Sequence, residues 1–359
     1  MLSTWMRTAR SVSTGGRRWL SRGVCGLTIT AGLLLLLGGT AAAYTALPAH
    51  VYAPYYETYL APNTPSITST AQASGAKYFT LAFLQTPKRG SCALDWNGSP
   101  NQPLSYYDSD IATLRAAGGD VIPSFGGYSA DQGATEIADS CKNVQQIATD
   151  YEQVIMTLGV TRLDMDVEAR SLNDTAGITR RNQAIAMTEA WAAGKGIPLQ
   201  IQYTLPVEQY GLDPNGEAVL QNAVTNGATV NSVNIMVFDY YIAGEGTVEM
   251  GTAAENAATN THAQLADIFP ALTSDQLWNI EGVTMLPGID DYPKKTEITY
   301  EPDATTILNF AQSNNMNFLS VWAIQRDNGS CPGTRDSNTC SGITQNTWDF
   351  SHLLNPFTG

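Results

Sequence analysis

Residues 163–168 of this chain read LDMDVE, so three acidic residues alternate with apolar ones along one short stretch. Alternate side chains of a β-strand face the same way, which puts Asp164, Asp166 and Glu168 on one face of a predicted strand. Three neighbouring carboxylates repel one another, and burial adds to the cost of ionising them all. At least one of them should therefore keep a proton near neutral pH, as general acid catalysis requires.

This stretch is the fourth of eight short runs rich in apolar and β-branched residues, with helical stretches between them. The predicted strands lie near residues 49–55, 78–84, 119–125, 161–168, 198–205, 231–240, 281–287 and 318–324. The clearest predicted helices lie near residues 107–117, 143–157, 178–194, 216–226, 252–269 and 304–314, and a first helix is expected within 64–75. This alternation predicts an α/β protein, and the count of eight predicts a (β/α)8 TIM barrel.

An open, doubly wound sheet is the alternative arrangement, but no glycine-rich phosphate loop follows the first predicted strand. In a barrel the active site lies at the C-terminal ends of the strands. Polar and aromatic side chains gather at those ends, as a carbohydrate site requires. They include Tyr55, Ser124, Tyr203, Met236, Asp239, Tyr240 and Trp322.

The first 43 residues have the features of an export signal. They hold five arginines and no acidic residue, then an apolar stretch that begins at Leu27, then the small residues that end at Ala43. We predict a signal peptide at 1–43, a secreted, extracellular protein, and a single catalytic domain at 44–359. The alternative is an uncleaved membrane anchor formed by residues 26–43.

Charge restricts the partners of the exported part. The formal net charge of the chain is −14, and loss of the five N-terminal arginines makes it −19. A surface this acidic argues against nucleic acid or an anionic membrane as a partner and fits a neutral or cationic substrate. We expect a monomer that contacts a membrane only if residues 1–43 are retained.

Four cysteines remain after residue 43, and an even number in an exported protein suggests disulfides. Cys331 and Cys340 bracket a polar loop, so we pair them with each other, which leaves Cys92 with Cys141. No C-x-x-C spacing is present and the three histidines are scattered, so we predict no metal site and no cofactor. Alternating carboxylates could also ligate a hard cation, and this remains the alternative interpretation of residues 163–168.

Four motifs resemble those of glycoside hydrolase family 18, in particular its bacterial-type chitinases. The family pattern D-x-x-D-x-D-x-E is matched in its last three acids by residues 161–168, and S-x-G-G by residues 124–127. The pattern M-x-[YFM]-D-Y is matched by residues 236–240, and W-[AS]-x-[NQ]-R-D by residues 322–327. The motifs occur in the family's order at four predicted strand ends and cover essentially the whole exported chain.

The resemblance implies a substrate-assisted, retaining hydrolysis of β-1,4 links between N-acetylglucosamine units, without a cofactor. Glu168 aligns with the general acid, and Asp166 with the acid that orients the substrate's N-acetyl group. Asp164 would hold the proton that it shares with Asp166, and Ser124 and Tyr55 would support it with hydrogen bonds.

The resemblance also implies a sugar-binding surface. Asp239 and Tyr240 align with residues that contact the N-acetyl group and the sugar, and Trp322 with the floor under the reacting sugar. Tyr203 is a further candidate for stacking on a sugar.

Two positions depart from the family pattern. Thr161 replaces its first Asp, at the start of the strand and far from the chemistry. Phe238 replaces a tyrosine that often bonds the N-acetyl carbonyl. Since Met236, Phe238 and Tyr240 should point the same way along a strand, we expect Tyr240 to supply the missing hydroxyl.

Two other functions remain open on the same scaffold. One is an endo-β-N-acetylglucosaminidase that cuts the chitobiose core of glycoproteins. The other is a non-catalytic chitin-binding lectin, although such relatives usually lack the acid that Glu168 provides. Only about 30 residues separate Pro287 from Phe318, so we expect no large α+β insertion, an open groove and endo-type cleavage.

Overall fold

A ring of parallel strands forms the centre of the molecule in the computed structural model, which describes residues 44–241, 248–291 and 296–359. The predicted signal peptide at residues 1–43 lies outside the described residues. Around the ring the strands follow the order β1 (Val51–Tyr52), β12 (Phe318–Val321), β9 (Glu281–Met285), β8 (Ser232–Met236), β7 (Gln200–Pro206), β6 (Arg162–Asp166), β5 (Asp120–Gly126), β3 (Tyr78–Gln85) and β2 (Tyr55–Glu57).

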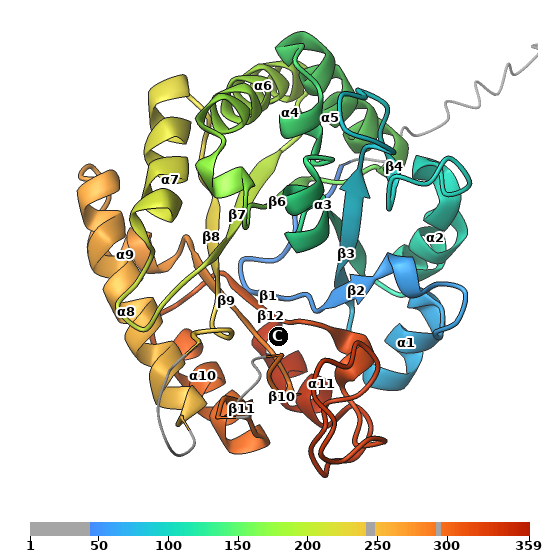
Figure 1. Cartoon of the computed structure of the whole chain (residues 1–359), viewed down its shortest axis with the longest axis vertical. Coiled ribbons are helices and arrows are strands. Elements are labelled where there is room, and N and C mark those ends of the chain that lie inside the picture. Colours follow the sequence, from blue (N-terminus) through green and yellow to red (C-terminus); the bar gives the residue numbers. More distant parts are fainter. Residues whose placement is uncertain (1–43, 242–247, 292–295) are drawn as a thin grey trace, which may run out of the picture. The chain divides into compact units, whose positions relative to one another are not determined.

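The first strand of the barrel is broken into β1 and β2, and this break lets it close the ring. β1 pairs in parallel with β12, and β2 pairs in parallel with β3. Between them, Ala53 donates its N–H to Leu319 and Pro54 accepts the N–H of Thr80, at 2.9 and 3.0 Å. The eight predicted strands are thus present, and the predicted TIM barrel is confirmed. Figure 1 shows the first strand, in blue, beside the last, in red.

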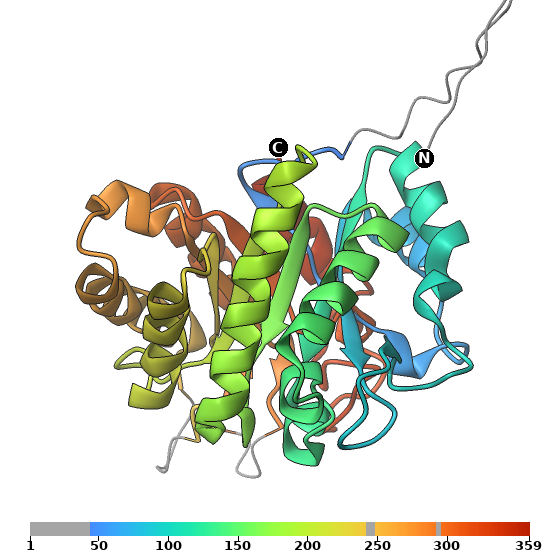
Figure 2. The ribbon, with the colours of Figure 1, turned by 90° about the horizontal axis from the view of Figure 1, so that it is seen from above.

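Helices cover the outside of the barrel (Figures 1 and 2). They are α1 (Ile67–Ser74), α2 (Asp108–Ala116), α3 (Tyr128–Gly133), α4 (Ile137–Ser140), α5 (Val144–Leu158), α6 (Thr175–Gly194), α7 (Pro214–Asn226), α8 (Met250–Ile268), α9 (Ser274–Trp278), α10 (Glu301–Ser313) and α11 (Asp349–Leu354). The predicted helices are all found. The short helices α3, α4, α9 and α11 were not predicted, because single turns carry too little periodicity.

Local sequence explains where the helices begin and end, as α5 illustrates. The side chain of Asn143 accepts the N–H of Gln146 at its start, and Gly159, in the left-handed conformation, ends it. Between these caps the residues at helical spacing are buried against the barrel. Within the described ranges, none of the helices has the length and apolarity needed to cross a bilayer.

The remaining strands are short. β4 (Asp95–Trp96) pairs antiparallel with β3, and β10 (Gly288–Ile289) pairs antiparallel with β11 (Ile298–Thr299). In the described part of the segment between β9 and β12, only this small hairpin and α10 are present. The expectation of a barrel without a large α+β insertion is therefore confirmed.

The two faces of the strands differ in chemistry. Outward residues such as Leu163 and Met165 belong to the main apolar core, which the helices complete. The inward face is polar: Thr204, Asn234 and Thr284 are fully buried and form a chain of side-chain hydrogen bonds of 2.9 Å each. This interior surrounds the acidic residues of β6.

Candidate active site

Asp164 lies on the floor of the site, at the centre of a network of donors. Its Oδ2 accepts hydrogen bonds from Ser124 Oγ at 2.6 Å and from Tyr55 OH at 2.9 Å. Its Oδ1 accepts from Thr204 Oγ1 at 2.7 Å and from Gln202 Nε2 at 3.0 Å. The support expected from Ser124 and Tyr55 is therefore present, and β7 adds two donors that the sequence analysis did not assign.

Burial raises the pKa of Asp164, while the four donors act to lower it by stabilising the carboxylate. Asp166, two residues further along β6, has no such support: its Oδ1 is buried without a hydrogen-bond partner among the described residues. Burial, Glu168 and Asp164 together raise the pKa of Asp166 well above its usual range. Because the pKa of both carboxyls is raised, the expectation that Asp164 holds the proton it shares with Asp166 stays a prediction.

Glu168 follows β6 at the rim of the barrel. Burial raises the pKa of its carboxyl to about 7, and the backbone N–H of Tyr128, which donates to this carboxyl, acts to lower the pKa. The backbone N–H of Glu168 itself donates to Asp131 Oδ2 at 2.6 Å. A carboxyl with a pKa near 7 holds a proton it can release at neutral pH, which suits a general acid.

An aromatic cluster forms one side of the site. Trp322 is partly exposed, and its ring stacks against Phe83 with centroids 5.6 Å apart and meets Tyr55 edge-on at 5.4 Å. Met236 and Phe238 pack on the same tryptophan. The arrangement leaves a flat, partly exposed indole beside the acids, and such a surface can stack on a sugar ring.

Asp239 lies just beyond the end of β8. Its backbone N–H donates a hydrogen bond to Asp290 Oδ2 at 3.0 Å. Burial, together with the side-chain hydrogen bond to Asp290, raises the pKa of Asp239 to about 9. The raised pKa favours the protonated form of Asp239, whose carboxyl is hydrogen-bonded to Asp290.

Known proteins resemble this chain over most of its length, although no family model matches it. A probable bifunctional chitinase/lysozyme from Escherichia coli is 33% identical over 323 residues, which cover 87% of this chain and 35% of that protein. Endochitinase 11 from Metarhizium anisopliae is 33% identical over 289 residues, which cover 79% of this chain and 53% of that protein. The chain thus spans between about a third and a half of these relatives' length.

The fold is similar to active domain 2 of a chitinase from Pyrococcus furiosus. That structure has a TM-score of 0.75 and 26% identity, covering 87% of this chain and 96% of that one. A second structure of the same domain, complexed with chito-oligosaccharides, has a TM-score of 0.73 at 26% identity, covering 87% of this chain and 95% of that one. The chain belongs to glycoside hydrolase family 18.

The structure brings most of the predicted family 18 residues together. Asp164, Ser124 and Tyr55 are directly bonded, and Asp166 and Glu168 follow on the same strand and its extension. Met236 and Trp322 pack against each other.

Two aromatic residues lie elsewhere than expected for this family 18 site. Tyr203 is fully buried on the outer face of β7, and its OH donates to Asn182 on α6 at 2.8 Å, so its expected contact with sugar is wrong. Tyr240 lies in the main core, apart from Met236 and Phe238. The expected alternation fails because β8 ends at Met236 and Asp239 has a φ of +54°.

Sequence reasoning missed Phe83 and Asp131 in this family 18 site. Phe83 lies at the end of the second predicted strand, where strand-end inspection could have found it. Asp131 lies on α3, four residues after the S-x-G-G motif, and no local pattern reveals its contact with Glu168.

The predicted disulfides are both present. Cys92 is joined to Cys141 with an S–S distance of 1.97 Å, and Cys331 is joined to Cys340. Among the described residues, no group of three or more His, Cys, Asp or Glu side chains has an arrangement that could hold a metal ion.

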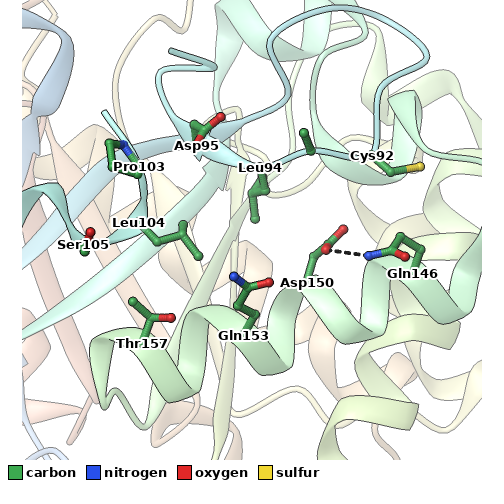
Figure 3. A pocket seen from close by; sticks show the side chains of 11 residues that line it. Cys92, Leu94, Asp95, Pro103, Leu104, Ser105, Gln146, Asp150, Gln153 and Thr157 are labelled. Carbon is green, nitrogen blue, oxygen red and sulfur yellow. Dashed lines mark hydrogen bonds between the residues drawn. The ribbon is translucent and has the colours of Figure 1, made fainter. Parts of the chain in front are cut away.

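A pocket of about 580 Å³ lies on the outside of this family 18 barrel, between the Cys92–Asp95 segment and α5. Figure 3 shows Gln146, Asp150, Gln153 and Thr157 projecting from α5 toward that segment. Gln146 donates to Asp150 at 2.9 Å, and burial raises the pKa of Asp150 to about 6. None of the predicted catalytic or sugar-binding residues lines this pocket.

Proposed function

We propose that this protein is a secreted chitinase that hydrolyses β-1,4 links between N-acetylglucosamine units with retention of configuration. The arrangement of Asp164, Asp166 and Glu168 carries the proposal: a floor carboxyl that accepts four hydrogen bonds, a buried neighbour whose Oδ1 has no partner among the described residues, and a rim acid whose pKa burial raises to about 7. The names of the two curated relatives and the chito-oligosaccharide complex of the Pyrococcus domain support it.

Glu168 acts first as the acid. Its proton passes to the glycosidic oxygen as the bond between that oxygen and the anomeric carbon breaks. The carbonyl oxygen of the substrate's own N-acetyl group forms the new bond to the anomeric carbon, so no protein nucleophile is needed. The leaving sugar departs with the proton, and Glu168 remains as a carboxylate.

Asp166 positions the acetyl group during this step. Its oxygen accepts the acetamido N–H, which fixes the carbonyl oxygen beneath the anomeric carbon and stabilises the positive charge on the ring that forms. Water then attacks the anomeric carbon from the face that the leaving group vacated, the bond between that carbon and the acetyl oxygen breaks, and Glu168 takes a proton from the water. Two displacements at one carbon leave the configuration unchanged.

Trp322 supplies the floor for the reacting sugar, because its partly exposed ring is held from behind by Phe83 and Tyr55. Asp239 contacts the N-acetyl group, the role that its place in the family motif at residues 236–240 implies. The acidic surface leaves neutral and amine-bearing sugars free to approach.

Export and association complete the proposal. Residues 1–43 direct export, and the two disulfides fit an oxidising compartment outside the cytoplasm. The mature protein acts as a monomer on chito-oligosaccharides, and contacts a membrane only if its N-terminal segment is retained.

Product analysis tests the function directly. Incubation with N-acetylglucosamine tetramers to hexamers should give shorter oligomers, and NMR should show the β-anomer first. Glu168→Gln should lower the rate by at least 10³-fold while circular dichroism and the melting temperature stay near those of the wild type. Oligomers blocked at one end should still be cut if action is of the endo type.

Three outcomes oppose the proposal. Normal turnover by Glu168→Gln excludes this acid. Release of glycans from a high-mannose glycoprotein, with oligomers left intact, favours an endo-β-N-acetylglucosaminidase. Binding of oligomers without any product over long incubation favours a lectin.

A further inference from the structure

Two glycines bring helix α3 against the end of β6. Gly126 and Gly127 have φ values of +96° and +80°. A Cβ on Gly126 would lie 2.1 Å from the backbone oxygen of Asp166, and one on Gly127 would lie 2.5 Å from the ring of Phe83. The N–H of Gly127 donates to that same oxygen of Asp166 at 3.1 Å. Only glycine permits this approach, which places the first turn of α3 beside the catalytic strand.

Helix α3 holds Glu168 at two points. The N–H of Tyr128 donates to the carboxyl of Glu168, and Asp131 accepts the backbone N–H of Glu168 at 2.6 Å. The sheet itself stops short of this residue, because its last backbone bond here runs from Val167 N–H to Thr204 at 2.9 Å. Ala169 then turns away with a φ of +45°. Asp131 thus replaces the missing sheet partner of Glu168.

Burial of the Asp131 carboxyl at this position costs folding free energy. It is fully buried, and its Oδ1 has no hydrogen-bond partner among the described residues. The charged groups that interact with it are Glu168, Asp166 on β6, Glu136 at the N-cap of α4, and Arg181 on α6. Arg181 is itself paired with Glu136 at 2.9 Å. A half-satisfied buried carboxyl destabilises a fold, so its presence beside the acid calls for a role in the site.

We propose that Asp131 is a positioning residue for the general acid Glu168. By fixing the backbone of Glu168, Asp131 sets the direction in which the carboxyl group of Glu168 points. The inference rests on the proposed function, in which Glu168 protonates the leaving oxygen. Asp131 contacts neither the substrate nor the reacting atoms. It acts by holding the backbone from which the acid side chain projects, so its loss lets Glu168 sample orientations in which proton transfer is slow.

The test distinguishes a role of Asp131 as a hydrogen-bond acceptor from a role in packing alone. Asp131→Asn keeps an acceptor oxygen for the N–H of Glu168, whereas Asp131→Leu removes it at similar volume. Asp150→Leu, in the outer pocket, is the matched control for loss of a buried carboxyl. Each protein is assayed on chitotetraose and on the 4-methylumbelliferyl and 3,4-dinitrophenyl β-chitobiosides. The dinitrophenyl leaving group departs almost without protonation, so it does not depend on a well-placed acid.

We expect Asp131→Leu to lower kcat on chitotetraose by about 100-fold with KM within about 3-fold, and on the dinitrophenyl glycoside by less than about 5-fold. Asp131→Asn should restore kcat on chitotetraose to within about 5-fold of the wild type, and Asp150→Leu should match the wild type on all three substrates. Should Asp131→Leu fail to fold, Asp131→Ala takes its place in the comparison.

Equal losses on the three substrates, or an Asp131→Asn variant as slow as Asp131→Leu, would overturn the inference alone. A wild type that cleaves none of the three substrates would overturn the proposed function, and the inference with it.

Discussion

Asp164 and Asp166 are the same residue type, two positions apart on one strand. Their hydrogen-bonding surroundings nevertheless differ between the floor and the rim of the site. On the floor, four side chains donate to Asp164, from β2, β5 and β7. At the rim, Asp166 has a buried oxygen without a partner among the described residues. The contrast shows that one residue type, on one face of one strand, can have its carboxylate stabilised by donors at one position and not at the next.

The largest effect that this contrast predicts is at Asp166. Asp166→Leu removes both oxygens that could accept the acetamido N–H, so kcat on chito-oligosaccharides should fall by about 10²- to 10³-fold. The fold should persist, because the buried Oδ1 of Asp166 has no hydrogen-bond partner among the described residues and leucine has a similar volume. Initial rates and thermal melts measure both. An Asp166 variant with nearly full activity would show that Asp166 does not orient the acetyl group.

Removing a floor donor should have a smaller effect on rate and a clear effect on stability. Ser124→Ala deletes the 2.6 Å bond to Asp164, so kcat should fall about tenfold and the free energy of unfolding should fall by about 1.5–3 kcal/mol. Urea denaturation and steady-state kinetics measure the two quantities.

Ser232→Ala is the control for the floor variant. Ser232 is also fully buried and donates to Asn317 at 2.8 Å, at the start of β8. It should lose stability without losing kcat. An equal loss of kcat in both serine variants would mean that the floor supports the fold and not the chemistry.

The pH dependence of kcat should report the ionisation of Glu168 at the rim. Burial raises the pKa of Glu168 to about 7, and the acid is active only while protonated. The rate should therefore be constant below pH 6 and fall toward tenfold per pH unit above about pH 7. A pH series in buffers of constant ionic strength measures the profile. A rate that stays constant to pH 9 would contradict the assignment of Glu168 as the acid.

The smallest expected effect is on stability against pH. The folded pKa of Glu168 lies above its unfolded value, so the folded state keeps this proton longer and loses stability as pH rises through about 7. Glu168→Gln cannot ionise. Its melting temperature should match that of the wild type near pH 4.5 and exceed it at pH 8. A melting temperature for Glu168→Gln below that of the wild type at pH 8 would show instead that ionised Glu168 stabilises the rim.

Cross-strand register explains one success and one failure of the sequence analysis. Asp164 pairs with Gln202 and Met165 with Tyr203 along β6 and β7. Residues at the same register share a face, so Asp164 faces inward with Gln202, and Tyr203 faces outward with Met165. Alternation along β6 was enough to predict that the acids share one face. The prediction for Tyr203 was wrong because it did not use the pairing of β7 with β6.

The end of β8 shows where local rules stop. Strand parity predicted one direction for Met236, Phe238 and Tyr240, but the backbone turns at Asp239, whose N–H bonds Asp290 from a segment 51 residues away. No pattern within residues 236–240 contains that contact.

The sequence by itself determined the barrel, the disulfide partners and the three acids on one face of one strand. These follow from local periodicity, from the number of cysteines and from the geometry of a strand. Only the tertiary structure decided the surroundings of each acid, because the four donors to Asp164 come from three other strands. It also decided how Glu168 is held, because Asp131 reaches it only through a helix that two glycines allow to pack there. Burial and donors set a pKa, and both are properties of the folded chain.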